Sequence, residues 1–151
     1  MARRILLGLA GILLVMQLIP AHLPEVKTAN PEDLLANNPV PEEIAAMLQN
    51  TCYDCHSNET QYPWYAYVAP VSFLVASDTR EGREHLNFSA WQSLSKADKL
   101  EALDDIGEEV AEGEMPLKVY PLMHAQARLS EEDRQALVTW AEEFAEKVFE
   151  E

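Results

Sequence analysis

Apolar residues recur every three or four positions in several stretches of the chain, which is the spacing of one face of an α-helix. Four such stretches stand out, at residues 41–51, 71–84, 95–112 and 130–148. No stretch alternates apolar and polar residues long enough to predict a β-sheet. The pattern predicts an all-α fold with long loops at residues 56–70, 85–94 and 113–129. Long loops in a small domain commonly serve a functional site.

Residues at the ends of these stretches match known helix signals. Pro41 suits the first position of the first helix, and Ser95 and Gly113 suit the N-cap and the C-terminal stop of the third. Ser130, followed by Asp133, resembles a capping box at the start of the fourth. We expect the fourth helix to bury Leu137, Trp140, Ala141, Phe144 and Val148.

The N-terminal segment, residues 1–21, has the pattern of a signal peptide or membrane anchor. Two arginines precede an apolar stretch at residues 5–19. A spanning helix needs about 20 apolar residues, so this shorter stretch fits an export signal or a short anchor. Ala21 is the candidate cleavage residue, but Ile19 is bulky for the position two before it. This favours an uncleaved anchor in the inner membrane, with the remainder on the periplasmic side.

Two further regions follow this segment. Residues 22–41 are rich in proline, which forbids a continuous helix, and are predicted to be a linker. Residues 42–151 are predicted to form a single small domain. The chain carries a formal net charge of −15, and so acidic a surface is repelled by phosphate backbones, which excludes nucleic-acid binding. The charge indicates a solvated surface or steering toward a basic protein partner.

The candidate chemistry lies in the motif Cys52-Tyr-Asp-Cys55-His56, which contains the only two cysteines of the chain. C-x-x-C-H is the attachment signature of c-type haem. Two cysteines three apart at a helix end project to one side, so they can form thioethers to both vinyl groups of one porphyrin. His56 then lies beneath the iron as the proximal axial ligand. One covalent haem would also stabilise a domain with little core.

Other interpretations of the two cysteines remain open. A thioredoxin-like dithiol shares the spacing but requires a βαβ context, which the sequence does not show. A zinc site would need two further ligands, and His85 and His124 lack the paired spacing of a structural zinc site. A chance match is the third alternative.

The sixth iron ligand has two candidates. Met115 lies in the polar loop Glu-Gly-Glu-Met-Pro, where burial in a core is hard to explain. A Met-Pro pair before a final amphipathic helix is similar to the arrangement in small cytochromes c. His124 is the alternative, and an open or water-bound iron is the third possibility.

An aromatic cluster follows the motif. Tyr62, Trp64 and Tyr65 are candidates for a wall around the haem edge, which would exclude water and raise the reduction potential. Ordinary core packing is the alternative. Arg80 and Arg83 are candidates to pair with haem propionates, or with acidic neighbours on their own helix.

Several stretches match one family beyond the C-x-x-C-H motif. They are residues 52–60, Tyr-Pro-Trp-Tyr at 62–65, Pro-Val-Ser at 70–72, residues 81–89 with Trp91, Gly-Glu-Met-Pro-Leu at 113–117, and residues 124–140. In these stretches the sequence resembles the small exported bacterial haem-binding domains, over about residues 40–142. The resemblance implies haem binding through Cys52, Cys55 and His56.

The leading functional expectation is a small, cytochrome c-like electron carrier with one haem c and unknown redox partner proteins. Six-coordinate iron with His and Met ligands favours electron transfer over substrate chemistry. The sequence offers no second catalytic group, no second haem motif and no nucleotide fingerprint, so an enzyme is not the first expectation. A peroxidase-type haem enzyme and a haem-based sensor or structural module are the alternatives.

Overall fold

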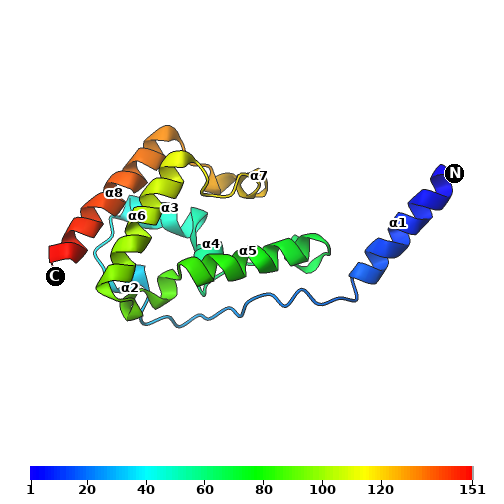
Figure 1. Ribbon diagram of the computed structural model, residues 1–151, viewed down its shortest axis with the longest axis horizontal. Helices are drawn as coiled ribbons and strands as arrows, with labels where there is room; N and C mark the ends of the chain where they lie inside the picture. The colour runs from blue at the N-terminus through cyan, green and yellow to red at the C-terminus, as the bar shows by residue number, and fades with distance from the viewer. Residues whose placement is uncertain (151) are drawn as a thin grey trace.

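The computed structural model describes residues 1–150, and their regular structure is entirely helical (Figure 1). The α-helices are α1 (Ala2–Met16), α2 (Leu34–Asn37), α3 (Glu42–Thr51), α4 (Tyr53–His56), α5 (Val71–His85), α6 (Lys96–Glu112), α7 (Tyr120–Met123) and α8 (Glu131–Glu150). Three 3₁₀ helices, η1 (Trp64–Tyr67), η2 (Phe88–Ser93) and η3 (Ala125–Ala127), lie in the predicted loops. The all-α prediction is therefore confirmed.

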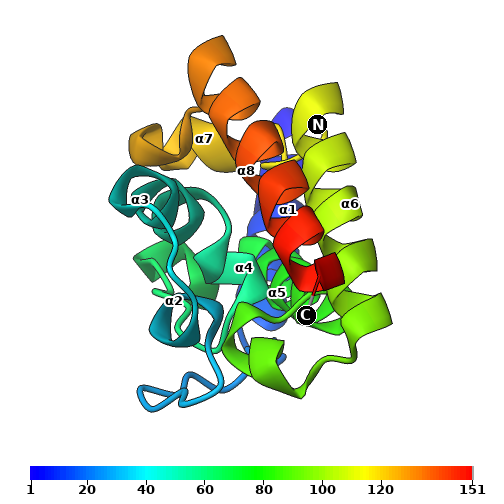
Figure 2. The same ribbon diagram turned by 90° about the vertical axis from the view of Figure 1, so that its left-hand side faces the viewer.

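Helices α6 and α8 lie side by side and enclose much of the core (Figures 1 and 2). All five residues expected to be buried on α8 are buried. Phe144 stacks between Trp91 and Trp140, with ring centroids 5.8 Å and 5.6 Å away. Trp91 belongs to η2 and the other two rings belong to α8, so the stack joins these elements. Burial of each large apolar side chain contributes about 1.5–3 kcal/mol to the stability of the fold.

The expected ends of α6 and α8 are confirmed. Ser95 and Asp98 form a reciprocal capping box at the start of α6. Gly113 ends that helix in the left-handed conformation with φ of 73°, which a side chain would disfavour. At α8, the Ser130 amide donates to the Asp133 carboxylate over 2.8 Å, and the Asp133 amide donates to the Ser130 hydroxyl. Pro41 lies at the N-cap of α3, one residue before the predicted position.

The predicted linker, residues 22–41, is hydrogen-bonded to the helical body in both of its halves. It contains α2, whose Leu34 is fully buried in the main core. The Asp33 carboxylate caps α2 by accepting from the Leu35 amide, and also accepts from the Tyr53 hydroxyl at 2.9 Å. A short helix with one buried leucine and one side-chain cap therefore lies inside the proline-rich stretch.

The N-terminal helix α1 projects away from the helical body (Figure 1). It has 15 residues, none of them buried. Within residues 1–150, no helix is long and apolar enough to cross a membrane. The extended segment after α1 runs along the domain, where Tyr62 donates to the Pro24 carbonyl at 2.9 Å and Arg83 donates to the Glu25 carbonyl at 2.7 Å.

Candidate functional site

The two cysteines lie where α3 gives way to α4. Cys52 interrupts the helix with φ of −115°, and Cys55 lies within the following turn. Both cysteines are free and half-buried. Burial raises the pKa of Cys52 to about 12 and that of Cys55 to about 11. A redox dithiol needs the opposite shift, toward thiolate, so this environment argues against the thioredoxin-like interpretation.

The zinc interpretation lacks a ligand set. Among the residues that the structure describes, no group of three or more His, Cys, Asp or Glu side chains converges as a metal site would require. Four such ligands are normal for structural zinc.

His56 is held by a hydrogen bond through one of its two ring nitrogens. Its Nδ1 lies 3.1 Å from the backbone carbonyl oxygen of Leu86. A carbonyl only accepts hydrogen bonds, so Nδ1 carries the proton and Nε2 keeps its lone pair. Burial lowers the pKa of His56, which favours the neutral ring. Metal-bound histidines commonly use such a carbonyl to fix their tautomer.

The residues around His56 come from the segment that follows α5. Leu86 is the first residue after that helix, and Phe88 meets the His56 ring edge-on with centroids 6.4 Å apart. Helix α5 also touches the motif directly. A β-carbon on Gly82 would lie 2.7 Å from the Cys55 carbonyl oxygen, so only glycine allows this approach.

Asp54, inside the motif, connects it to two other segments. Its side chain accepts from the Gln61 amide at 2.7 Å and from the Tyr120 hydroxyl at 2.6 Å. Its backbone carbonyl accepts from the Thr60 hydroxyl at 2.7 Å. Burial, followed by the hydrogen bond to Asp54, raises the pKa of Tyr120, which keeps its hydroxyl protonated as a donor. Asp54 thereby fixes α7 against the motif.

His124 is engaged by two aromatic residues. Its ring stacks on Tyr120 with centroids 4.2 Å apart and an interplanar angle of 12°. Its Nε2 shares a hydrogen bond with the Tyr65 hydroxyl. The structure thus brings together two of the predicted site residues, Tyr65 and His124. Iron ligation through Nε2 of His124 would require this bond to break.

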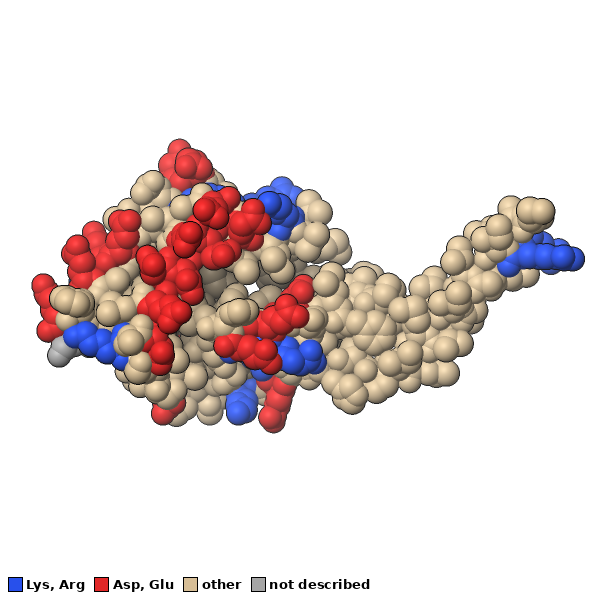
Figure 3. All heavy atoms as spheres, viewed as in Figure 1, with Lys and Arg blue, Asp and Glu red and all other residues tan. Residues whose placement is uncertain are grey.

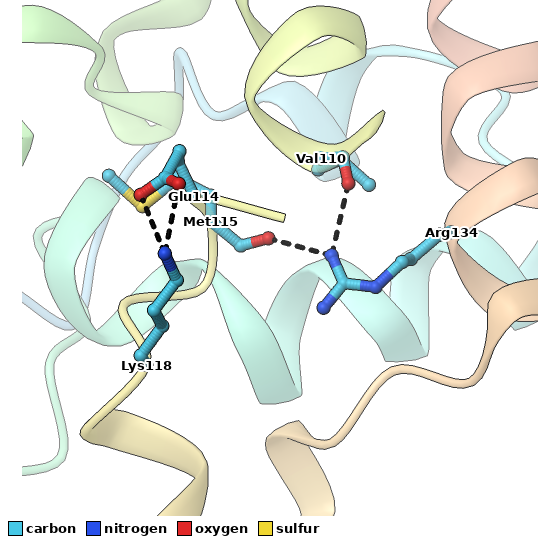
Figure 4. A network of polar contacts seen from close by, with 5 residues as sticks. All are labelled: Val110, Glu114, Met115, Lys118 and Arg134. Carbon is cyan, nitrogen blue, oxygen red and sulfur yellow. Dashed lines mark hydrogen bonds and ion pairs between the residues drawn. The ribbon is translucent and has the colours of Figure 1, made fainter. Parts of the chain in front are cut away.

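Met115 lies in the loop that follows α6, and its backbone is tightly held (Figure 4). Its amide donates to the Glu109 carbonyl at 3.0 Å. Arg134 of α8 donates through one nitrogen to the carbonyls of Val110 and Met115, at 3.0 and 3.2 Å. Figure 4 shows the thioether directed away from Arg134. The backbone is therefore fixed by α6 and α8, while the half-buried sulfur makes none of these bonds.

Among the other candidates, Tyr62 and the two arginines contact the segment after α1, whereas Trp64 is exposed. The Tyr62 hydroxyl binds the segment that follows α1, and Trp64 exposes 74% of its surface. The guanidinium of Arg83 binds that same segment and the Thr60 hydroxyl, at 2.9 Å, and Arg80 donates to the His22 carbonyl at 3.4 Å. A haem wall from Tyr62, Trp64 and Tyr65 stays a prediction, and Tyr65 shares a hydrogen bond with the candidate ligand His124.

Sequence reasoning missed the residues that position these groups. They are Asp54, Gly82, Leu86, Tyr120 and Arg134. A glycine inside the helical stretch 71–84 was a usable signal, since such a glycine often marks a close approach. The Leu86 carbonyl carries no signal, because any residue has one.

One comparison with known proteins found a family match. A family model described as a haem-binding domain matches residues 11–143. No match was found among curated proteins, and none among solved structures. Two free thiols and an imidazole whose Nδ1 is bonded to a carbonyl are donors that suit a covalent haem, so the residues of the motif fit that group.

Proposed function

This chain belongs to the haem-binding domain family, and from that membership we propose that it carries one haem c and works as an electron-transfer module. Cys52 and Cys55 would hold the group through thioethers, with His56 as proximal ligand and Met115 as distal ligand. The observation that carries the proposal is the bond from His56 to the Leu86 carbonyl at 3.1 Å. This bond leaves Nε2 as the ring nitrogen that would bind iron, on the residue that directly follows Cys55.

The bound group would supply a one-electron redox couple, and the chain's part is to keep the coordination fixed. The loop of Met115 is fastened by Arg134 and by the Glu109 carbonyl. A ligand that does not move between oxidation states lowers the reorganisation that electron transfer requires. The Tyr65 bond to His124 favours Met115 as the sixth ligand.

The site of action proposed is the periplasmic face of the inner membrane, with residues 5–19 attaching the chain there. Apolar side chains are exposed along the whole of α1, and Arg3 and Arg4 precede them. The acidic domain would meet its redox partner protein through charge complementarity.

The test of covalent attachment uses the full chain produced with periplasmic cytochrome maturation. After acid acetone extraction, we expect the haem to stay with the polypeptide, and a Cys52→Ser, Cys55→Ser control to lose it. Haem that extracts completely from the unmodified chain would contradict the proposal. A methionine-to-iron charge-transfer band in the near infrared would support the carrier, whereas a high-spin ferric spectrum would favour a peroxidase-type enzyme or sensor.

The location is tested separately with protease added to intact spheroplasts. We expect digestion of the domain, and a cytoplasmic marker protein as the protected control. Protection of the domain under the same conditions would place it in the cytoplasm.

A further inference from the structure

The η1 helix and the start of α5 expose a group of large apolar and aromatic side chains. This group, called the α5 patch below, consists of Trp64, Tyr67, Val68, Val71 and Leu74. Trp64 and Tyr67 expose 74% and 67% of their surfaces. Val71 and Leu74 lie three residues apart and therefore share one face of the helix. Contiguous apolar surface of this kind marks an interaction site.

The α5 patch lies in a segment without charge. No Asp, Glu, Lys or Arg occurs from Thr60 to Ser77, although the whole chain has a net charge of −15. Figure 3 shows acidic side chains over the α6 and α8 end of the molecule and beside α5, while the surface between there and the basic tip of α1 shows neither colour of charge. The patch can therefore pack against an apolar surface that is neutral or weakly anionic. It offers no negative charge to a basic protein partner.

The α5 patch adjoins the apolar N-terminal helix. The Gln17 side chain, just after α1, donates to the Ala69 carbonyl and accepts from the Ala69 amide, both at 3.0 Å. A cavity of about 270 Å³ between the two segments is lined by Ile19, Leu23 and Tyr67 among others. Because this paired bond fixes the chain next to the patch, α1 and the patch form neighbouring apolar surfaces.

We propose that the α5 patch rests in the membrane interface beside α1. Trp64 and Tyr67 would lie at headgroup level, where their amphipathic rings are favoured. Val71 and Leu74 would face the boundary with the acyl chains. The lipid surface is the occupant because the patch is uncharged, aromatic and fastened to the segment that enters or lies on the bilayer. The inference rests on the proposed membrane location and adds a fixed orientation to it.

The orientation has a consequence for electron transfer. With the α5 patch on the lipid, the acidic α6 and α8 end points away from the membrane (Figures 1 and 3). Negative charge held away from anionic headgroups avoids repulsion at the bilayer. The same charge remains available to steer a soluble partner toward the domain.

The experiment places the full-chain holoprotein in phosphatidylcholine nanodiscs, one chain per disc, and measures hydroxyl-radical modification by mass spectrometry. Each residue's rate is divided by its rate in the urea-unfolded chain. Phe149 is the internal reference, since it is 70% exposed and lies at the far end of α8. We expect Trp64 and Tyr67 to react at least about fivefold more slowly than Phe149, because interfacial burial excludes the aqueous radical.

A variant that introduces negative charge into the patch is compared with a matched control. Val71→Glu with Leu74→Glu should bring Trp64 and Tyr67 to the Phe149 rate while the haem stays covalently attached. Gln135→Glu with Thr139→Glu adds the same charge on the exposed face of α8 and should leave the protection unchanged.

Three results would overturn the inference. Trp64 and Tyr67 reacting as fast as Phe149 in disc-bound protein would leave the patch in water, with the membrane location intact. Protection that appears only with two chains per disc would make the occupant a second copy of this chain. Failure of the holoprotein to co-purify with discs would remove the membrane location as well.

Discussion

Gly82 of α5 approaches Cys55 so closely that a β-carbon on Gly82 would lie 2.7 Å from the Cys55 carbonyl oxygen. The same helix ends at His85, and the next residue supplies the carbonyl that binds His56. One helix therefore sets the position of the second thiol and the orientation of the proximal histidine. Their relative placement depends on how closely α5 packs on the motif.

Gly82→Ala should therefore weaken the site. Real β-carbons essentially never come within 3.0 Å of such an atom, so α5 or the motif must shift. Overpacking of this kind costs about 1–3 kcal/mol. We expect a lower urea midpoint for the holoprotein and a lower ratio of haem to protein after maturation.

Gly107→Ala is the matched control for this substitution. Gly107 lies within α6, and a β-carbon added there would have nothing within 4 Å of it. Alanine should stabilise the helix there by about 0.5–1 kcal/mol. If both variants were stabilised equally, the close approach of α5 to Cys55 would not constrain the site.

Tyr120→Phe tests the bond between α7 and the motif. It removes the hydroxyl that donates to the Asp54 carboxylate at 2.6 Å. A hydrogen bond to a charged group contributes about 1.5–3 kcal/mol. We expect faster amide exchange in α7 and a weaker methionine-to-iron band, because the segment after Met115 loses its attachment to the motif. Tyr67→Phe, in an exposed ring, should change neither measurement.

The parts of the fold that the sequence predicted are those determined locally. Ser95 with Asp98 and Ser130 with Asp133 each lie within one helical turn, and the spacing of apolar residues on α8 identified its buried face. The C-x-x-C-H spacing is local in the same sense. Patterns within a few residues of one another can be read without knowing the tertiary structure.

The parts that were missed depend on contacts distant in sequence. Leu34 lies in a proline-rich stretch, and its burial depends on helices far along the chain. The Leu86 carbonyl lies 30 residues from His56, and Tyr120 lies 66 residues from Asp54. The bonds from Tyr62 and Arg83 to the segment after α1 also join residues far apart in sequence.

Arg134→Gln tests whether the Met115 loop is held from α8. Arg134 donates to two carbonyls, those of Val110 and Met115. The Val110 carbonyl still accepts from the Gly113 amide at 3.2 Å, so the substitution leaves the Met115 carbonyl unpaired, which should cost about 1–3 kcal/mol. In a thermal scan followed by haem absorption, we expect the variant to change from low-spin, six-coordinate iron to high-spin iron at a lower temperature than the unmodified protein. Arg80→Gln, at an exposed residue with one long bond of 3.4 Å, should leave that temperature unchanged.

The final prediction separates the two candidate distal ligands, and it rests on their different surroundings. The Met115 sulfur makes no polar bond in its braced loop, whereas Nε2 of His124 is occupied by Tyr65. A thioether favours ferrous iron, so His/Met ligation has a higher potential than bis-histidine ligation. Met115→His should keep the iron six-coordinate and lower its potential in a redox titration.

Met115→Ala should open the sixth position, give a high-spin ferric spectrum and allow carbon monoxide to bind the ferrous form readily. His124→Ala should leave the spectrum close to that of the unmodified protein, because it removes only the partner of Tyr65 and the stack on Tyr120. The reverse pair of results would assign the site to His124. If neither substitution altered the spectrum, the sixth position would be open or water-bound in the native protein, and a haem enzyme or sensor would explain the site better than an electron carrier.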